Sequence, residues 1–147
     1  MDKYESIKLD NQVCFSLYAA SREIIKLYKP YLDKYNLTYT QYIAMLVLWE
    51  DEKSTVKDIG KRLHLDSGTL TPLLKKIESM GLVTRYRDVN DDRVVIVELT
   101  EKGRLLKENV TEVPQEMACK INMPREDLIE LKIKLDNMLG VLNKIIK

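Results

Sequence analysis

The chain has 147 residues with a formal net charge of +1; 45% of the residues are hydrophobic and 32% are charged. This length predicts one domain, residues 1–147, and the composition is that of an ordinary globular protein. The small net charge excludes a polycation, and two cysteines are too few for a disulfide-built scaffold. Residues 1–11 lack the apolar core of a signal peptide and no stretch is long enough to span a membrane, so we expect a cytoplasmic protein.

Two helices are predicted before residue 50. The first covers about residues 11–35, with Asp10 as its N-cap and two adjacent apolar stripes that should be buried against several neighbours or a partner subunit. Pro30 predicts a kink or a break in this helix. The second covers about residues 40–49, where Tyr42 and Trp49 belong to an apolar face with helical spacing.

A helix-turn-helix is predicted next, from a short helix at about residues 55–63 and a second helix at 67–80 capped by Asp66. Pro72 should bend the second helix, or else begin a shorter helix capped by Thr71. The outward face of this helix carries small polar residues and then lysines, which suit base edges and phosphates respectively. These residues are Ser67, Gly68, Thr69, Thr71, Lys75 and Lys76.

A basic β-hairpin follows, with strands at about 82–87 and 94–99 and a turn-rich connection. Strand alternation places Arg85 and Arg87 on one face, and Arg93 lies at the tip, where it could enter a narrow minor groove. Residues 61–87 contain six lysines and arginines against two carboxylates. The order of elements therefore predicts a winged helix-turn-helix that binds double-stranded DNA; charge alone fits a solvated basic face equally well.

The remaining residues predict a helix from about 100 that ends or kinks at Pro114, and a last helix at about 125–146. Apolar residues of the last helix recur every three or four positions, like a coiled-coil seam. Such a seam suggests dimerisation, with packing inside one chain as the alternative. The expected fold is mainly α with a small β-hairpin wing (α+β), in which residues 11–50 and 101–147 are helical dimerisation parts and 54–99 bind DNA.

Several segments resemble the MarR family of bacterial regulators. The wing tip Asp91-Asp92-Arg93 and the Leu99-Thr100-x-x-Gly103 that follows it are typical of the family. A closer resemblance is to the organic-hydroperoxide-sensing branch, OhrR. It lies in four segments: NQVCF-x-LYA at 11–19, YKP at 28–30, TYTQY at 38–42 and LDSGTLTP at 65–72.

The resemblance implies a homodimer on a pseudo-palindromic operator, with Cys14 as the thiol that organic hydroperoxides oxidise. It further implies that Tyr28 and Tyr39 of the partner subunit hydrogen-bond this sulfur, and that Cys119 is a resolving thiol that forms an intersubunit disulfide with Cys14. By spacing alone, Cys14 fits a buried and inert core residue better. No metal cluster, phosphate loop or hydrolytic triad is present, so we expect no cofactor, no metal and no enzymatic activity.

The hypothesis that follows is a redox-switched repressor. Its first alternative is a MarR-type regulator that is released from DNA by a small aromatic ligand, with Cys14 passive. The second is a thiol peroxidase, which leaves the LDSGTLTP helix unexplained.

Overall fold

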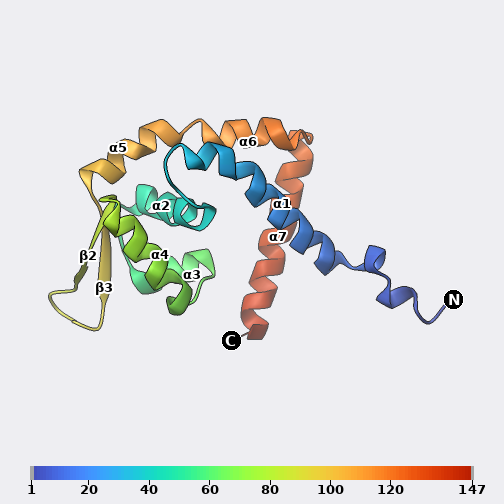
Figure 1. Ribbon diagram of the computed structural model, residues 1–147. Coiled ribbons are helices and arrows are strands. Elements are labelled where there is room, and N and C mark those ends of the chain that lie inside the picture. The colour runs from blue at the N-terminus through green and yellow to red at the C-terminus, as the bar shows by residue number, and fades with distance from the viewer. Residues whose placement is uncertain (1, 147) are drawn as a thin grey trace. The chain divides into compact units, whose positions relative to one another are not determined.

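The computed structural model describes residues 2–146, which form helices and one small sheet (Figure 1). The chain divides into two compact units, one ending at Val113 and the other beginning at Pro114. In chain order the elements are the 3-10 turns η1 (Glu5–Ile7) and η2 (Leu9–Asn11), α1 (Val13–Asp33), α2 (Tyr39–Asp51), β1 (Lys53–Thr55), α3 (Val56–Leu63), α4 (Ser67–Ser79), β2 (Val83–Arg87), β3 (Val95–Leu99), α5 (Glu101–Val110), α6 (Val113–Ile121) and α7 (Arg125–Ile146).

Helix α1 differs from its prediction at both ends. It begins at Val13, and its N-cap, Gln12, makes no side-chain capping bond. Asp10 lies in the preceding 3-10 turn, so the predicted cap is wrong. The helix continues through Pro30, so the predicted break is wrong. The proline removes one backbone hydrogen bond, and the turns on either side of it remain helical. Only Leu32 of α1 is buried within the chain.

Helix α2 lies at the centre of the first unit. A capping box starts this helix. The backbone N–H of Gln41 donates to the Thr38 hydroxyl, and the backbone N–H of Thr38 donates to the side-chain carbonyl oxygen of Gln41. It contacts α1, α3, α4 and α5. Seven of its residues are buried: Gln41, Tyr42, Ala44, Met45, Val47, Leu48 and Trp49. Although α2 falls within the predicted dimerisation part, it forms the core on which the DNA-binding helices pack.

The helix-turn-helix is formed by α3 and α4 as predicted. Thr55 caps α3 and Asp66 caps α4, each through a side-chain oxygen that accepts a backbone N–H three residues on. Between the helices, His64 adopts a left-handed conformation with φ of 56°. Pro72 lies inside α4, so the alternative of a shorter helix capped by Thr71 is wrong.

The sheet has three antiparallel strands in the order β1-β3-β2, and β2 and β3 form the predicted hairpin. In its register Val83 pairs with Leu99 and Arg87 with Val95. The unpredicted strand β1 pairs with the other edge of β3, where Lys53 lies opposite Glu98. Because Thr55 ends β1 and also caps α3, the sheet runs directly into the helix-turn-helix.

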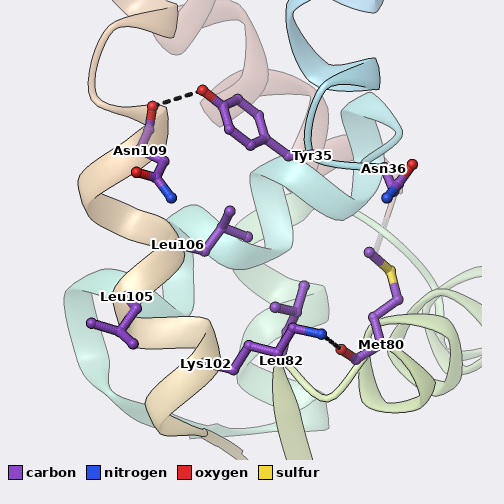
Figure 2. Close-up of a pocket in the computed structure, with 8 residues that line it drawn as sticks. All are labelled: Tyr35, Asn36, Met80, Leu82, Lys102, Leu105, Leu106 and Asn109. Atoms are coloured by element: carbon purple, nitrogen blue, oxygen red, sulfur yellow. Dashed lines mark hydrogen bonds between the residues drawn. The ribbon is translucent and has the colours of Figure 1, made fainter.

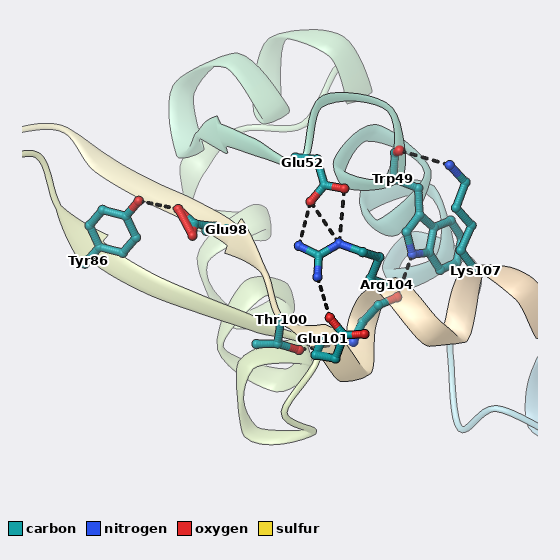
Figure 3. A network of polar contacts seen from close by, with 9 residues as sticks. Trp49, Glu52, Tyr86, Glu98, Thr100, Glu101, Arg104 and Lys107 are labelled. Carbon is teal, nitrogen blue, oxygen red and sulfur yellow. Dashed lines mark hydrogen bonds and ion pairs between the residues drawn. The ribbon is translucent and has the colours of Figure 1, made fainter.

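Polar contacts join α5 to α2 and to the base of the hairpin (Figure 3). The indole N–H of Trp49 donates to the carbonyl of Gly103 at 2.8 Å, in a buried position. The guanidinium of Arg104 pairs with the carboxylates of Glu52 and Glu101. These contacts fix the first turn of α5 beside the end of α2.

The second unit consists of α6 from Pro114 onward and of α7. Pro114 lies in the first turn of α6, a position that proline tolerates, and the preceding helix already ends at Val110. Helix α7 has the predicted bounds, and none of its residues is buried within the chain. No helix among residues 2–146 combines the length and apolar character needed to cross a membrane.

Candidate DNA interface and redox site

Helix α4 presents opposite faces to the core and to solvent. Leu70, Leu73, Leu74 and Ile77 are buried beneath it. The outward residues are exposed except for Thr71, which is half-buried: Ser67, Gly68, Thr69, Lys75 and Lys76. All six residues predicted for this face therefore lie away from the buried side. Lys75 and Lys76 make no ion pair within residues 2–146, so both ammonium groups are available to an anion.

The predicted wing arginines have three different environments. Arg85 is half-buried; its backbone N–H and its guanidinium both donate to the carboxylate of Glu78. Arg87 is exposed and donates to the backbone carbonyl of Asp92 at 2.6 Å. Because its charge is paired and its side chain anchored, Arg85 is a structural link between α4 and β2, and the DNA role assigned to it is the weakest of the three.

The tip arginine is held but remains open to solvent. Its Nε and Nη2 atoms each donate to the Asp91 carboxylate at 3.0 Å, and 87% of the Arg93 side chain is exposed. These bonds keep the pKa of Asp91 below its usual value. Asp91 also accepts the backbone N–H of Arg93. The Asp91 carboxylate therefore shapes the turn and orients the Arg93 guanidinium.

Cys14 is the second residue of α1 and is exposed in the single chain. Backbone N–H groups in the first turn of a helix have no partner within the helix, and they favour a nearby negative charge such as a thiolate. The alternative that Cys14 is a buried core residue is therefore wrong for the single chain, in which Cys14 is exposed. Cys119 is also exposed, in α6 of the second unit.

The two tyrosines singled out by motif position come together. The ring centroids of Tyr28 and Tyr39 are 4.9 Å apart, although one lies in α1 and the other begins α2. Tyr42 lies 5.8 Å from Tyr28 and 6.3 Å from Tyr39, and its ring also contacts Trp49 at 6.4 Å. The sequence reasoning placed Tyr42 and Trp49 only on an apolar face. The helical spacing of Tyr42 and Trp49 from Tyr39 could have indicated that both residues belong to this aromatic cluster.

Burial controls the ionisation of the tyrosine cluster. It is the largest cause that raises the pKa of Tyr28 to about 12, with smaller contributions from Tyr39 and Tyr42. Burial also raises the pKa values of Tyr39 and Tyr42 above 10.0. The phenols therefore remain neutral hydrogen-bond donors at physiological pH. No group of three His, Cys, Asp or Glu side chains within residues 2–146 is placed to hold a metal ion.

Replacing Tyr28 by Phe should flatten the loss of stability at high pH. The unfolded chain ionises Tyr28 near pH 10, whereas the folded chain holds its proton up to about pH 12. The stability present below pH 10 is therefore lost as the pH rises through this window. Denaturant midpoints measured from pH 9 to about pH 12 should fall less steeply in Tyr28→Phe than in the parent. Equal slopes would contradict the buried phenol.

Comparison with known proteins gives consistent results. The family model for the transcriptional regulators SarA/Rot matches residues 26–110. The chain is 50% identical over 143 residues, 97% of each protein, to the organic hydroperoxide resistance transcriptional regulator of Bacillus subtilis strain 168.

Two solved structures of AbfR, a protein of Staphylococcus epidermidis, are also similar. The reduced form bound to DNA is 36% identical and covers 100% of both chains, with a TM-score of 0.83. The disulfide form is 36% identical, covers 93% of this chain and 96% of that one, and has a TM-score of 0.66. These similarities confirm the winged helix fold and the resemblance to the hydroperoxide-responsive branch. The relatives are transcriptional regulators and not enzymes, which counts against a thiol peroxidase.

Proposed function

This chain belongs to the SarA/Rot family of transcriptional regulators, which share the MarR-like winged helix, and we propose that it is a repressor released from its operator when an organic hydroperoxide oxidises Cys14. The observation that carries the proposal is an exposed thiol in the first turn of α1, in a chain that is 50% identical to a regulator of organic hydroperoxide resistance. The disulfide form of AbfR supports a thiol switch in a similar fold.

The proposed chemistry needs no cofactor. The Cys14 thiolate attacks the outer oxygen of the hydroperoxide, the O–O bond breaks, and the alkoxide leaves as an alcohol after taking a proton. The sulfur is oxidised to a sulfenic acid and the hydroperoxide is reduced. Attack by the Cys119 thiolate on the sulfenic sulfur then forms a disulfide and displaces hydroxide, which takes up a proton and leaves as water. Tyr28 and Tyr39, supplied by the partner subunit, would donate hydrogen bonds to the thiolate.

A gel-shift titration tests the function directly. Cumene hydroperoxide should release the protein from operator DNA, and dithiothreitol should restore binding. Cys14→Ser should bind DNA and ignore the hydroperoxide. If Cys14→Ser is released by a phenolic compound while hydroperoxide has no effect on the parent, the protein is a ligand-released regulator instead.

Apolar residues exposed on α1 and α7 favour a homodimer. Val13, Tyr18 and Ile25 of α1 are exposed, as are Ile133 and Leu142 of α7, and no described residue of α7 is buried. Large apolar surfaces of this kind mark interfaces in soluble proteins. A second copy of the chain is the occupant that a two-fold operator requires.

We therefore expect a dimer throughout the micromolar range in sedimentation velocity. We expect the exposed apolar face of α7 to be buried in the dimer. Leu142→Glu should therefore weaken the dimer, because it places a charge without a partner in this interface. Lys144→Glu, which changes charge at an exposed position on the same helix, serves as the control. A parent protein that sediments as a monomer would rule out the dimer.

On DNA, α4 should enter the major groove, with Ser67, Gly68, Thr69 and Thr71 near base edges and Lys75 and Lys76 near phosphates. Arg87 and Arg93 would follow the backbone and minor groove. The recognition helices of the dimer should meet half-sites about 34–36 Å apart.

The double variant Lys75→Ala, Lys76→Ala should weaken binding to all DNA sequences to a similar degree. Each lost phosphate contact should reduce the magnitude of the log–log salt slope by about one. Fluorescence anisotropy at several salt concentrations measures this slope. Lys57→Ala, on the exposed side of α3, is the matched control. An unchanged slope in the double variant would place the DNA away from α4.

A further inference from the structure

A cavity of about 450 Å³ lies within the first unit, where the end of α4 and the start of β2 face α5 (Figure 2). Its volume falls in the range of small-molecule sites. The cavity is distinct from the DNA-binding face of α4, from Cys14 and from the tyrosine cluster. The proposed redox switch therefore assigns no role to this cavity.

The middle of the cavity is aliphatic. Leu82 is buried in its floor, and the side chains of Leu106 and Met80 are half-buried at its walls. Tyr35 supplies the one aromatic ring among the lining residues, and its hydroxyl is already bonded to the carbonyl of Asn109 at 2.8 Å. Flexible aliphatic and thioether walls suit an alkyl chain better than a flat aromatic ring.

The two ends of the cavity are polar in different ways. At one end the Lys102 ammonium donates to the Met80 carbonyl at 2.8 Å and has no ion pair within residues 2–146. At the other end lie Asn36 and Asn109, whose side-chain amides form no hydrogen bond within the described chain. Lys102 and Asn109 are seven residues apart on α5, which corresponds to about 10 Å along the helix.

From these features we propose that the cavity binds a medium-chain aliphatic carboxylate. The carboxylate lies at Lys102, which supplies the unpaired positive charge. The alkyl chain covers Leu82, Leu106 and Met80. A hydroxyl group at the far end of the chain meets the free side-chain amide of Asn109, so ω-hydroxy acids bind more tightly than plain ones.

Calorimetric titration of the reduced protein with decanoate tests the site. Decanoate should bind saturably and more tightly than decan-1-ol or decyltrimethylammonium, which have the same chain with no charge or the opposite charge. Lys102→Met keeps an apolar side chain and removes the charge, and should weaken decanoate binding roughly tenfold. Lys102→Arg keeps the positive charge and should retain decanoate binding. That result would show that the weaker binding of Lys102→Met comes from the lost charge and not from misfolding. Lys57→Met on α3 is the matched control.

The far end is tested separately with 10-hydroxydecanoate. The parent should prefer it to decanoate, and Asn109→Leu should abolish that preference while still binding decanoate. Equal binding of decanoate, decanol and decyltrimethylammonium, or equal affinities of Lys102→Met and Lys57→Met for decanoate, would overturn the proposal. Because no step involves Cys14, these outcomes are independent of the redox switch.

Discussion

Hydroperoxide treatment should produce a band of dimer mass in non-reducing electrophoresis, joined between Cys14 of one chain and Cys119 of the other. Both thiols are exposed, as a resolving reaction requires. Reduction should return the band to monomer mass and restore operator binding. Cys14 that is oxidised beyond the sulfenic acid can no longer condense with a second thiol, so protein treated with excess hydroperoxide before Cys119 reacts should give no dimer band.

The proposed disulfide would release DNA because of where the two cysteines lie along the chain. Cys14 belongs to the unit that carries the winged helix, and Cys119 belongs to the unit that begins at Pro114. A disulfide requires Cα atoms within about 4.4–6.8 Å. Forming this bond between subunits therefore ties the second unit of one chain to the DNA-binding unit of the other and removes their freedom to match two successive major grooves.

Single substitutions separate the possible switches. The dimer band should disappear in Cys14→Ser and in Cys119→Ser. If hydroperoxide still releases Cys119→Ser from DNA, the sulfenic acid or a mixed disulfide at Cys14 is sufficient. If the dimer band persists in Cys14→Ser, the sensing role of that residue is wrong.

Replacing Gly103 by Ala should destabilise the protein by about 2 kcal/mol, because overpacked buried sites typically cost about 1–3 kcal/mol. A Cβ atom at this position would lie 2.2 Å from the carbonyl oxygen of Leu82 and 3.1 Å from its carbonyl carbon. Both atoms belong to the backbone, so neither can rotate away. The thermal midpoint measured by circular dichroism should fall by roughly 5 °C or more.

Gly140→Ala in α7 is the matched control, because nothing lies within 4 Å of the added Cβ atom there. Alanine favours a helix over glycine by about 1 kcal/mol, so this variant should be at least as stable as the parent. The fluorescence of Trp49, which is bonded to Gly103, should change only in Gly103→Ala. A Gly103→Ala protein as stable as the parent would contradict the close packing at the base of the wing.

Helices with strong local signals were predictable from the sequence. The apolar repeat of α7 gave its bounds, and Asp66 marked the start of α4 because its capping bond reaches only three residues along the chain. The start of α1 was misjudged since Asp10 is equally suited to a short 3-10 turn. Strand β1 was missed because Lys53–Thr55 has no alternating pattern; its conformation comes from pairing with β3, more than forty residues away.

The candidate site shows the same dependence on distance along the chain. Motif positions identified Tyr28 and Tyr39, but the contribution of Tyr42 appears only when α1 packs against α2. Arg85 had the same sequence signature as Arg87. Its ion pair with Glu78 depends on the turn between α4 and β2, and local composition could not distinguish the two arginines.

The continuity of β1 with α3 sets where the gene can tolerate insertions and deletions. Residues added to the open connection at 88–94 would lengthen the hairpin tip and leave the β2–β3 register in place. One residue added between Thr55 and Val56 would instead remove the cap of α3 and turn every following helical side chain by about 100°. Homologous genes should therefore differ in length at the tip and keep a fixed length from Lys53 to Leu63.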